Sequence, residues 1–192
     1  MRSTRTLFII EVAILTALAL VLDLIPFLKF KLWAQGGSIS FAMIPVFIVA
    51  FRWGLKGGLL SGLLWGILQI ATGDAYILNF WQGLIDYGFA FTLLGLAGIV
   101  SKQVHEAVKE NQVSKIIQYV VIGVLIGGFG RFISHFLAGT IFFADAAPEG
   151  QAAWLYSLIY NMSYMIPALI IAMIVIGFLF AKQPRLLMRS VS

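Results

Sequence analysis

Long apolar runs, separated by short polar segments, constrain this chain more than any other feature of its sequence. They fall at about 7–25, 39–53, 57–72, 77–101, 116–143 and 154–181. A helix needs about 20 residues to cross the hydrocarbon core of a bilayer, so four of these runs are long enough to span it alone. Charged residues make up only 11% of the chain, against about 25% of soluble domains. We therefore predict a single integral membrane domain, residues 1–192, with no separate soluble part.

The two short runs, 39–53 and 57–72, are interpreted as compact spans joined by a tight turn. This interpretation places Arg52 and Lys56 at a membrane surface, whereas the alternative is one re-entrant hairpin. The predicted fold is thus all-α, with six transmembrane helices and both termini in the cytoplasm. Ten of the 13 basic residues then lie inside, as the positive-inside rule requires. These ten are Arg2, Arg5, Arg52, Lys56, Lys102, Lys109, Lys115, Lys182, Arg185 and Arg189.

The first run also resembles a secretory signal peptide, since Arg2 and Arg5 precede it and "ALA" at 17–19 is a possible cleavage site. Glu11 interrupts the apolar stretch, however, and the hydrophobic run continues through "LVLDLIP". We therefore retain this run as the first span.

Several classes of function lack the residues that they would need. No cysteine is present, which excludes disulfides, thiolate metal sites and cysteine nucleophiles. The net charge of +5 comes from basic residues that flank the apolar runs, so no basic face for nucleic acid is predicted. The chain has no phosphate-binding loop, no serine–histidine pair and no paired carboxylates. Neither ATP hydrolysis nor another enzymatic activity is therefore expected of it.

Three stretches within the predicted spans carry polar and aromatic side chains, namely "GDAYILNFWQGLIDYGFAF", "GRFISHFLAGTIFF" and "WLYSLIYNMSYMIP". In the six-span topology all three lie in the outer half of the membrane, so their side chains can converge on one cavity near the external face. The candidate residues are Tyr76, Trp81, Gln82, Asp86, Tyr87, Arg131, His135, Phe142, Phe143, Tyr156, Tyr160, Asn161 and Tyr164.

Most of these side chains also have an ordinary structural explanation. The tyrosines and tryptophans can form an interfacial belt, and Asn161 can hydrogen-bond between helices. His135 can be a satisfied interior imidazole, and Arg131 a structural partner or a snorkelling residue. Asp86 is harder to explain in this way, because a carboxylate inside a membrane is costly and marks a functional site by default. One anion, one imidazole, one amide and several aromatic faces together predict a small, flat, cationic heteroaromatic ligand.

Small residues recur at four-residue spacing on several predicted helices. Such a face lets two helix backbones approach closely, so we predict tight helix packing there. The residues are Gly58, Gly62, Gly66, Gly123 and Gly127, with Ala13 and Ala17 forming a similar face on the first span.

Four longer motifs carry a more specific resemblance. They are "QGGSISFAMIPVFIVAFRWGLKGGLLSGLLWGILQ", "LIDYGFAFTLLGLAG", "HFLAGTIFFADAAPEG" and "LYSLIYNMSYMIP". In this order they resemble the thiamine-binding S components, the ThiT family, of energy-coupling-factor (ECF) transporters, and the resemblance covers nearly the whole chain. It implies a six-helix protein of the bacterial cell membrane that captures thiamine from the outside with high affinity. It also implies a transmembrane coupling protein and two cytoplasmic ATPases as partners, which alone use ATP, and no cofactor in this chain.

The resemblance also implies a set of ligand-binding residues. By position within the matching motifs these are Trp33, Tyr76, Asp86, Tyr87, His135, Phe143, Tyr156 and Asn161. Two of them depart from the expected pattern: Asp86 stands where we expect glutamate, and Phe143 where we expect tryptophan. The face formed by Ala13 and Ala17 is expected to dock onto the transmembrane coupling protein.

Other functions remain as alternatives to thiamine binding. An S component for another vitamin or precursor, such as hydroxymethylpyrimidine, would bind a ligand that lacks the thiazolium ring equally well. An intramembrane enzyme using Asp86 and His135 would turn over its bound compound, whereas a binding component would release it unchanged. A purely structural membrane subunit would bind no ligand in a saturable manner.

Overall fold

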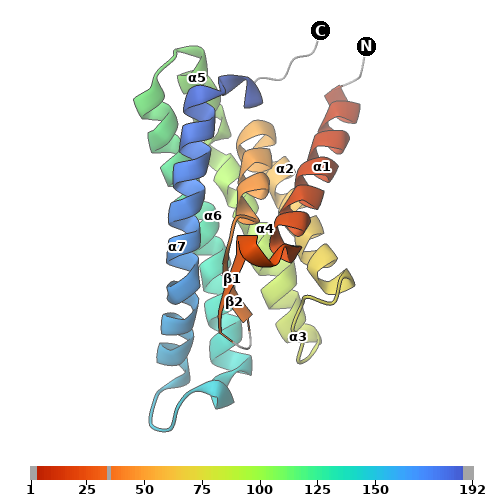
Figure 1. Cartoon of the computed structure of the whole chain (residues 1–192), viewed down its shortest axis with the longest axis vertical. Helices are drawn as coiled ribbons and strands as arrows, with labels where there is room; N and C mark the ends of the chain where they lie inside the picture. The colour runs from red at the N-terminus through yellow and green to blue at the C-terminus, as the bar shows by residue number, and fades with distance from the viewer. Residues whose placement is uncertain (1–3, 34–35, 188–192) are drawn as a thin grey trace.

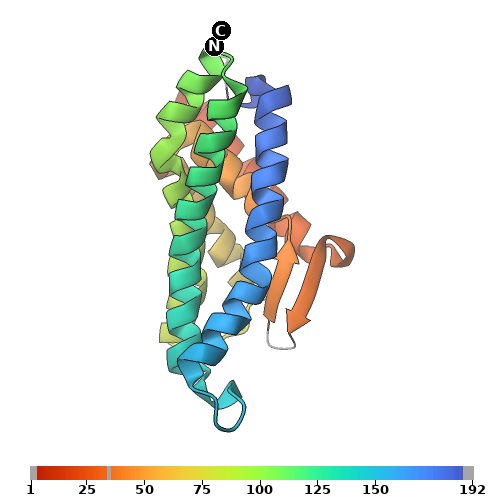
Figure 2. The ribbon, with the colours of Figure 1, turned by 90° about the vertical axis from the view of Figure 1, so that its left-hand side faces the viewer.

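The computed structural model describes residues 4–33 and 36–187, which form a bundle of long helices with a β-hairpin on one side (Figures 1 and 2). Within these residues, five helices are long and apolar enough to cross a membrane. They are Thr4–Leu24, Met43–Ala71, Phe80–Lys109, Val113–Phe142 and Ala153–Lys182. The start of the first helix and the end of the last lie at the same end of the bundle (Figure 1).

Four of these spans are single helices: α1 (Thr4–Leu24), α2 (Met43–Ala71), α6 (Val113–Phe142) and α7 (Ala153–Lys182). The third span is divided into α3 (Phe80–Gly83), the π-helical η2 (Leu84–Phe89), α4 (Ala90–Leu93), the 3-10 segment η3 (Leu94–Val100) and α5 (Ser101–Lys109). The remaining elements are the strands β1 (Lys29–Trp33) and β2 (Gly36–Ser40) and the short 3-10 turns η1 (Pro26–Leu28), η4 (Ala144–Ala146) and η5 (Pro184–Leu186).

Helix α2 reverses direction at Gly54, which has a φ of 74° and a ψ of −168°. Glycine adopts a positive φ without steric penalty, so the residue suits this sharp turn. A Cβ at Gly58 would lie 2.7 Å from the Cβ of Ala50, although eight residues of straight helix span about 12 Å. The two arms of α2 therefore fold back on each other (Figure 1). The turn lies between the two short apolar runs, but the first arm (43–53) extends only about 16 Å, roughly half a hydrocarbon core.

The second arm of α2 packs backbone against backbone with the segmented third span. A Cβ at Gly62 would lie 2.2 Å from the carbonyl oxygen of Phe91, and one at Gly66 would lie 2.0 Å from that of Tyr87. The predicted close packing of these glycines is confirmed. Their contact holds η2 against α2, so the π-helical turn that carries Asp86 and Tyr87 has a fixed position.

The two halves of the bundle differ in how they are filled. The half nearer the termini is a packed core of side chains such as Phe47, Phe51, Leu94, Val124 and Phe180. Farther along the same helices, polar and aromatic residues replace these apolar ones and surround a cavity. The apolar half thus supports the polar half.

The β-hairpin is an addition to the predicted all-α fold. Strands β1 and β2 pair antiparallel, with Lys29 opposite Ser40 and Trp33 opposite Gly36. Alternate side chains of a strand face opposite sides, so Lys29, Lys31 and Trp33 share one face. Lys29 and Lys31 line the cavity, whereas the Phe30 side chain between them is exposed. The hairpin therefore covers one side of the half of the bundle that contains the cavity, the hollow half (Figure 2).

Candidate functional site

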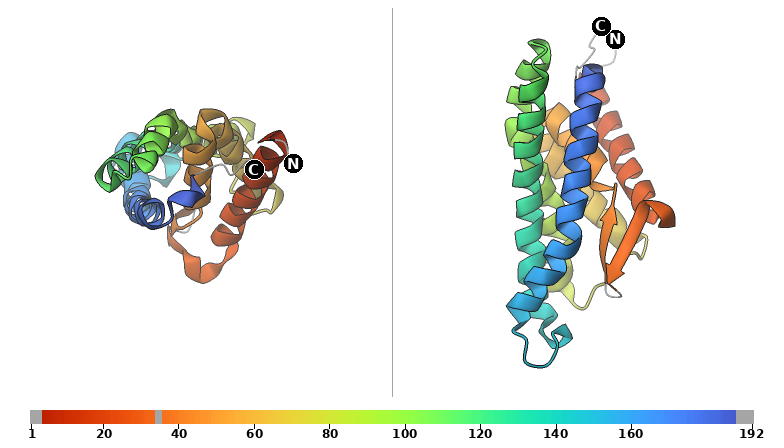
Figure 3. Two further views of the ribbon diagram at one scale, coloured as in Figure 1. Left: turned by 90° about the horizontal axis from the view of Figure 1, so that it is seen from above. Right: turned by 60° about the vertical axis from the view of Figure 1, so that its left-hand side comes forward.

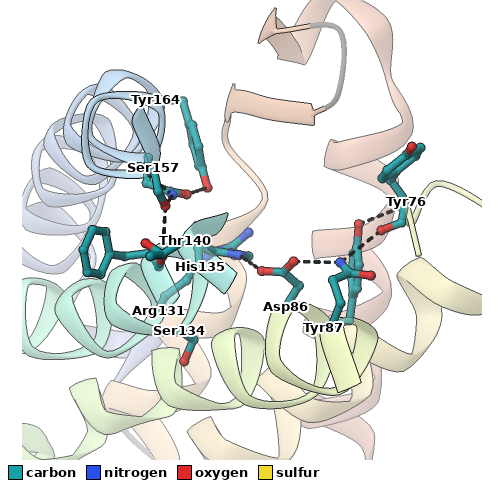
Figure 4. A network of polar contacts seen from close by, with 12 residues as sticks. Tyr76, Asp86, Tyr87, Arg131, Ser134, His135, Thr140, Ser157 and Tyr164 are labelled. Carbon is teal, nitrogen blue, oxygen red and sulfur yellow. Dashed lines mark hydrogen bonds and ion pairs between the residues drawn. The ribbon is translucent and has the colours of Figure 1, made fainter. Parts of the chain in front are cut away.

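A cavity of about 380 Å³ lies among η2, α6, α7 and the β-hairpin. Its volume is within the range of small-molecule sites. The structure brings together seven of the eight predicted ligand residues in its wall, namely Tyr76, Asp86, Tyr87, His135, Phe143, Tyr156 and Asn161. Figure 4 shows the polar side chains meeting around Asp86 and His135.

The eighth predicted residue, Trp33, does not line the cavity. Its Nε1 donates a hydrogen bond to Ser163 Oγ at 2.9 Å. Its ring packs against the rings of Tyr160 and Tyr156, with centroids 5.5 and 6.4 Å away. In this structure Trp33 supports the tyrosine wall from outside.

Asp86 is the central anion of the cavity, and its side chain is nearly buried. One oxygen, Oδ2, accepts a hydrogen bond from Gln82 Nε2 at 2.7 Å, and Oδ1 lies 2.8 Å from His135 Nδ1. Gln82 is held in turn by the backbone, since its Oε1 accepts from the Leu78 amide at 2.9 Å and its Nε2 donates to the Tyr76 carbonyl at 3.2 Å. The carboxylate is therefore fixed before any ligand arrives.

Arg131 lies behind His135, one helical turn away on α6 (Figure 4). Its Nε donates to His135 Nε2 at 3.1 Å. The guanidinium carbon also lies 4.2 Å from the centre of the Phe91 ring and 5.1 Å from that of Trp65. A guanidinium over an aromatic face is stabilised by the ring quadrupole. Arg131 therefore faces the interior as a structural partner, and the interpretation as a snorkelling residue is wrong.

Asn161 belongs to a second network on the α7 side of the cavity. Its Nδ2 donates to the Ser157 carbonyl at 2.9 Å, and its Oδ1 accepts from the Tyr164 hydroxyl at 2.7 Å. Ser157 Oγ continues the network across to α6, donating to the Phe136 carbonyl at 2.9 Å. The predicted hydrogen bond of Asn161 between helices is not found among the described residues, because its partners Ser157 and Tyr164 lie on its own helix. Ser157 makes the link between helices instead, and Asn161 lines the cavity.

Aromatic rings form much of the remaining wall. Tyr87 stacks on Phe91 with centroids 5.6 Å apart, and its hydroxyl accepts from the Tyr76 amide at 2.8 Å. The Tyr76 ring lies 6.1 Å from that of Phe143. Ring faces of this kind bind flat heteroaromatic groups and attract cations.

An ion cluster at the edge of the cavity was not predicted as part of the site. Lys29 on β1 forms ion pairs with Asp74, in the α2–α3 connection, and with Asp23 at the end of α1, the latter at 3.6 Å. Gln69 on α2 also donates a hydrogen bond to Asp23. The cluster ties the hairpin to two other elements. Its residues escaped prediction because charges at the ends of spans are common.

Several known proteins share this sequence and architecture. Residues 9–188 match the family described as Thiamine transporter protein (Thia_YuaJ). The chain belongs to this thiamine transporter family. It is 42% identical over 186 residues to the thiamine transporter ThiT of Bacillus subtilis (strain 168), covering 97% of this chain and 96% of the relative. It is 33% identical over 181 residues to ThiT of Lacticaseibacillus paracasei, covering 93% and 89% of the two chains.

Solved structures also resemble this member of the thiamine transporter family. A structure of ThiT from Listeria monocytogenes has a TM-score of 0.91 at 34% identity, covering 97% of this chain and all of that one. The S component of a bacterial ECF transporter has a TM-score of 0.60 at 18% identity, again over 97% and 100%, and therefore shares the fold. With its five long apolar helices, this family member is a multi-pass protein of a bacterial membrane, and its relatives are named as transporters rather than enzymes.

Proposed function

We propose that this chain is the thiamine-binding S component of an ECF transporter, and that it captures thiamine from the outside in the cavity around Asp86. The observation that carries the proposal is a fixed, nearly buried carboxylate facing an aromatic cavity, in a member of the thiamine transporter family. Thiamine combines a cationic thiazolium ring with an aminopyrimidine ring. The carboxylate offers the charge and hydrogen-bond acceptor, and the tyrosine faces offer stacking surfaces.

The proposed ligand set is Trp33, Tyr76, Asp86, Tyr87, His135, Phe143, Tyr156 and Asn161, of which all but Trp33 line the cavity. Trp33 contributes indirectly, by holding Tyr156 and Tyr160 in place. The shorter arm of Asp86, compared with the expected glutamate, is accommodated because His135 and Gln82 both reach its oxygens.

The proposed topology has six membrane crossings with both termini in the cytoplasm. Two features support it. The arms of α2 run in opposite directions, so the turn between them lies at the end of the bundle that holds both termini. There Arg52 pairs with Glu11 of α1 and donates to the Leu186 carbonyl. The same end of the bundle holds the start of α1, the turn of α2, α5, the start of α6 and the end of α7 with η5 (Figure 1). These segments carry Arg5, Arg52, Lys56, Lys102, Lys109, Lys115, Lys182 and Arg185, so the positive-inside rule assigns that end to the cytoplasm. The cavity then opens toward the outside.

We also propose that α1 docks onto the transmembrane coupling protein, which in turn works with two cytoplasmic ATPases. Helix α1 lies at the edge of the bundle, packed mainly against α2 (Figure 3). Ala13 and Ala17 are exposed on its outer side. A partner helix can approach closely over such small side chains.

The test is a titration of purified protein in detergent with thiamine and with hydroxymethylpyrimidine, followed by tryptophan fluorescence. Removing one partner of a desolvated charged hydrogen bond costs about 2–5 kcal/mol. We expect saturable thiamine binding in the parent protein and a loss of at least about tenfold in Asp86→Asn. Equally tight binding of hydroxymethylpyrimidine would show that the thiazolium is not recognised. Recovery of a converted compound would indicate an enzyme instead.

A further inference from the structure

The contact between Arg131 and His135 determines where the imidazole proton lies. A guanidinium carries only donors, so the hydrogen bond from Arg131 Nε to His135 Nε2 requires a lone pair on Nε2. The proton of a neutral imidazole must then be on Nδ1, from which it is donated to Asp86 Oδ1 at 2.8 Å. The three side chains form a directed chain of hydrogen bonds from the cation to the carboxylate.

A second proton on His135 conflicts with this arrangement in two ways. It would occupy the lone pair that accepts from Arg131, leaving two donors pointing at each other. It would also place an imidazolium in direct contact with a guanidinium that stays charged under all ordinary conditions. Arg131 is itself held in place by the rings of Phe91 and Trp65, so it does not swing away easily.

We propose that Arg131 is a positioning residue that holds His135 neutral, with its proton on Nδ1, so that Asp86 keeps its full negative charge for a cationic ligand. This inference rests on the proposed function, because it assumes that the ligand of the cavity is a cation such as thiamine. Arg131 itself lines the cavity, but the role proposed here is exerted through its hydrogen bond to His135.

Other ionisable groups line the same cavity as His135 without a hydrogen bond to its ring among the described contacts. The cavity wall that His135 shares holds Tyr87 on η2, Tyr156, Tyr160 and Tyr164 on α7, Lys29 and Lys31 on β1, Asp23 on α1, and Asp74 and Tyr76 in the α2–α3 connection. Among the hydrogen bonds of the described residues, those of the His135 ring go to Arg131 and Asp86. Lys29 is already paired with Asp23 and Asp74. Arg131 is thus the cation that acts directly on the imidazole.

Removing the Arg131 guanidinium should change how thiamine binding depends on pH. Without Arg131, His135 Nε2 can take up a second proton, and the Asp86 carboxylate beside Nδ1 stabilises the imidazolium that forms. The resulting imidazolium would pair with Asp86 and neutralise the charge that attracts the ligand. Thiamine affinity should therefore become pH-dependent, falling by up to tenfold per pH unit because a single proton is coupled to binding.

The experiment measures the thiamine dissociation constant of Arg131→Gln at about pH 8 and about pH 5.5, with the parent protein measured in parallel. At each pH the dissociation constant of the variant is divided by that of the parent protein, which cancels any effect of the titration of thiamine itself. We expect this ratio to rise about tenfold or more between the two pH values. A second substitution, His135→Asn, replaces the Nδ1 donor by an amide that does not titrate. Added to Arg131→Gln, it should abolish the rise. A ratio that stays constant in Arg131→Gln would overturn the proposal.

A measurement without ligand separates this inference from the proposed function. The chain has two histidines, so His105→Gln leaves His135 as the single source of imidazole signals in a nitrogen-15 spectrum. The spectrum should show a protonated Nδ1 and an unprotonated Nε2 over the whole range from about pH 8 to about pH 5.5. Protonation of both nitrogens within that range would contradict the proposal that Arg131 holds His135 neutral. A protein that keeps this spectrum but does not bind thiamine would contradict the proposed function alone.

Discussion

The polar side chains around Asp86 are tolerated inside the membrane because they hydrogen-bond to one another. Asp86 accepts from Gln82 and His135, and His135 accepts from Arg131. Asp86 and His135 could be predicted from the sequence, since a polar group within an apolar run demands an explanation. The contacts of Arg131 could not be predicted, because its orientation depends on where the Phe91 ring lies.

Gly37, near the tip of the hairpin, lies close against aromatic rings. It has a φ of +68°, and a Cβ there would lie 2.9 Å from the Tyr164 ring and 3.1 Å from the Trp33 ring. Gly37→Ala should therefore push the hairpin away from the tyrosine wall and weaken thiamine binding by about tenfold or more, as measured by fluorescence titration.

Gly150→Ala is the matched control for this substitution. Gly150 has a similar φ of +82°, but a Cβ there would have nothing within 4 Å. This variant therefore carries the same backbone strain without the crowding. It should lose stability while keeping its thiamine affinity. Equal affinities in the two variants would show that the contact of the hairpin with the tyrosines does not matter for binding.

Whole elements differ in how well the sequence predicted them. The long helices followed from the length of their apolar runs, and the turn in α2 from the break between two of them. The β-hairpin was missed because "KFKLW" is too short for its alternation to stand out beside long helices. The π-helical and 3-10 segments were also missed, since they arise where the third span packs backbone to backbone against the glycines of α2.

One face of helix α1 packs against α2, and the opposite face is exposed. Polar contacts at three levels join it to α2: Glu11 with Arg52 at 2.5 Å and with Trp53 at 2.7 Å, Thr16 with Ser61 at 2.8 Å, and Asp23 with Gln69. These contacts lie near the N-terminal end, the middle and the C-terminal end of the helix. They leave the side that carries Ala13 and Ala17 exposed.

A bulky side chain on that exposed face should therefore block a partner without disturbing the cavity. We predict that Ala13→Trp or Ala17→Trp abolishes thiamine uptake by cells and changes thiamine affinity of the purified protein by less than about twofold. Ile174→Trp, on the exposed side of α7, is the control and should leave both intact. Parallel loss of uptake and binding in the alanine variants would mean that this face of α1 packs within the protein.

The whole molecule combines a packed half with a hollow half. The packed half, near the termini, holds the apolar core, and the hollow half holds the carboxylate, the imidazole and the aromatic wall. This division explains why charged groups can lie at membrane depth, since they face the cavity or each other instead of lipid. In the proposed topology the cavity opens toward the outside, so a ligand would enter it from that side of the membrane only.

Thiamine binding to sealed membrane vesicles of defined orientation tests the central claim most directly, because it examines the ligand and the side of entry together. Labelled thiamine should bind saturably to right-side-out vesicles that contain the parent protein. It should bind to inside-out vesicles only after they are made permeable, and vesicles with Asp86→Asn should show at least about tenfold weaker binding. Saturable binding to intact inside-out vesicles, or none to vesicles of either orientation, would contradict an outward-facing thiamine site around Asp86.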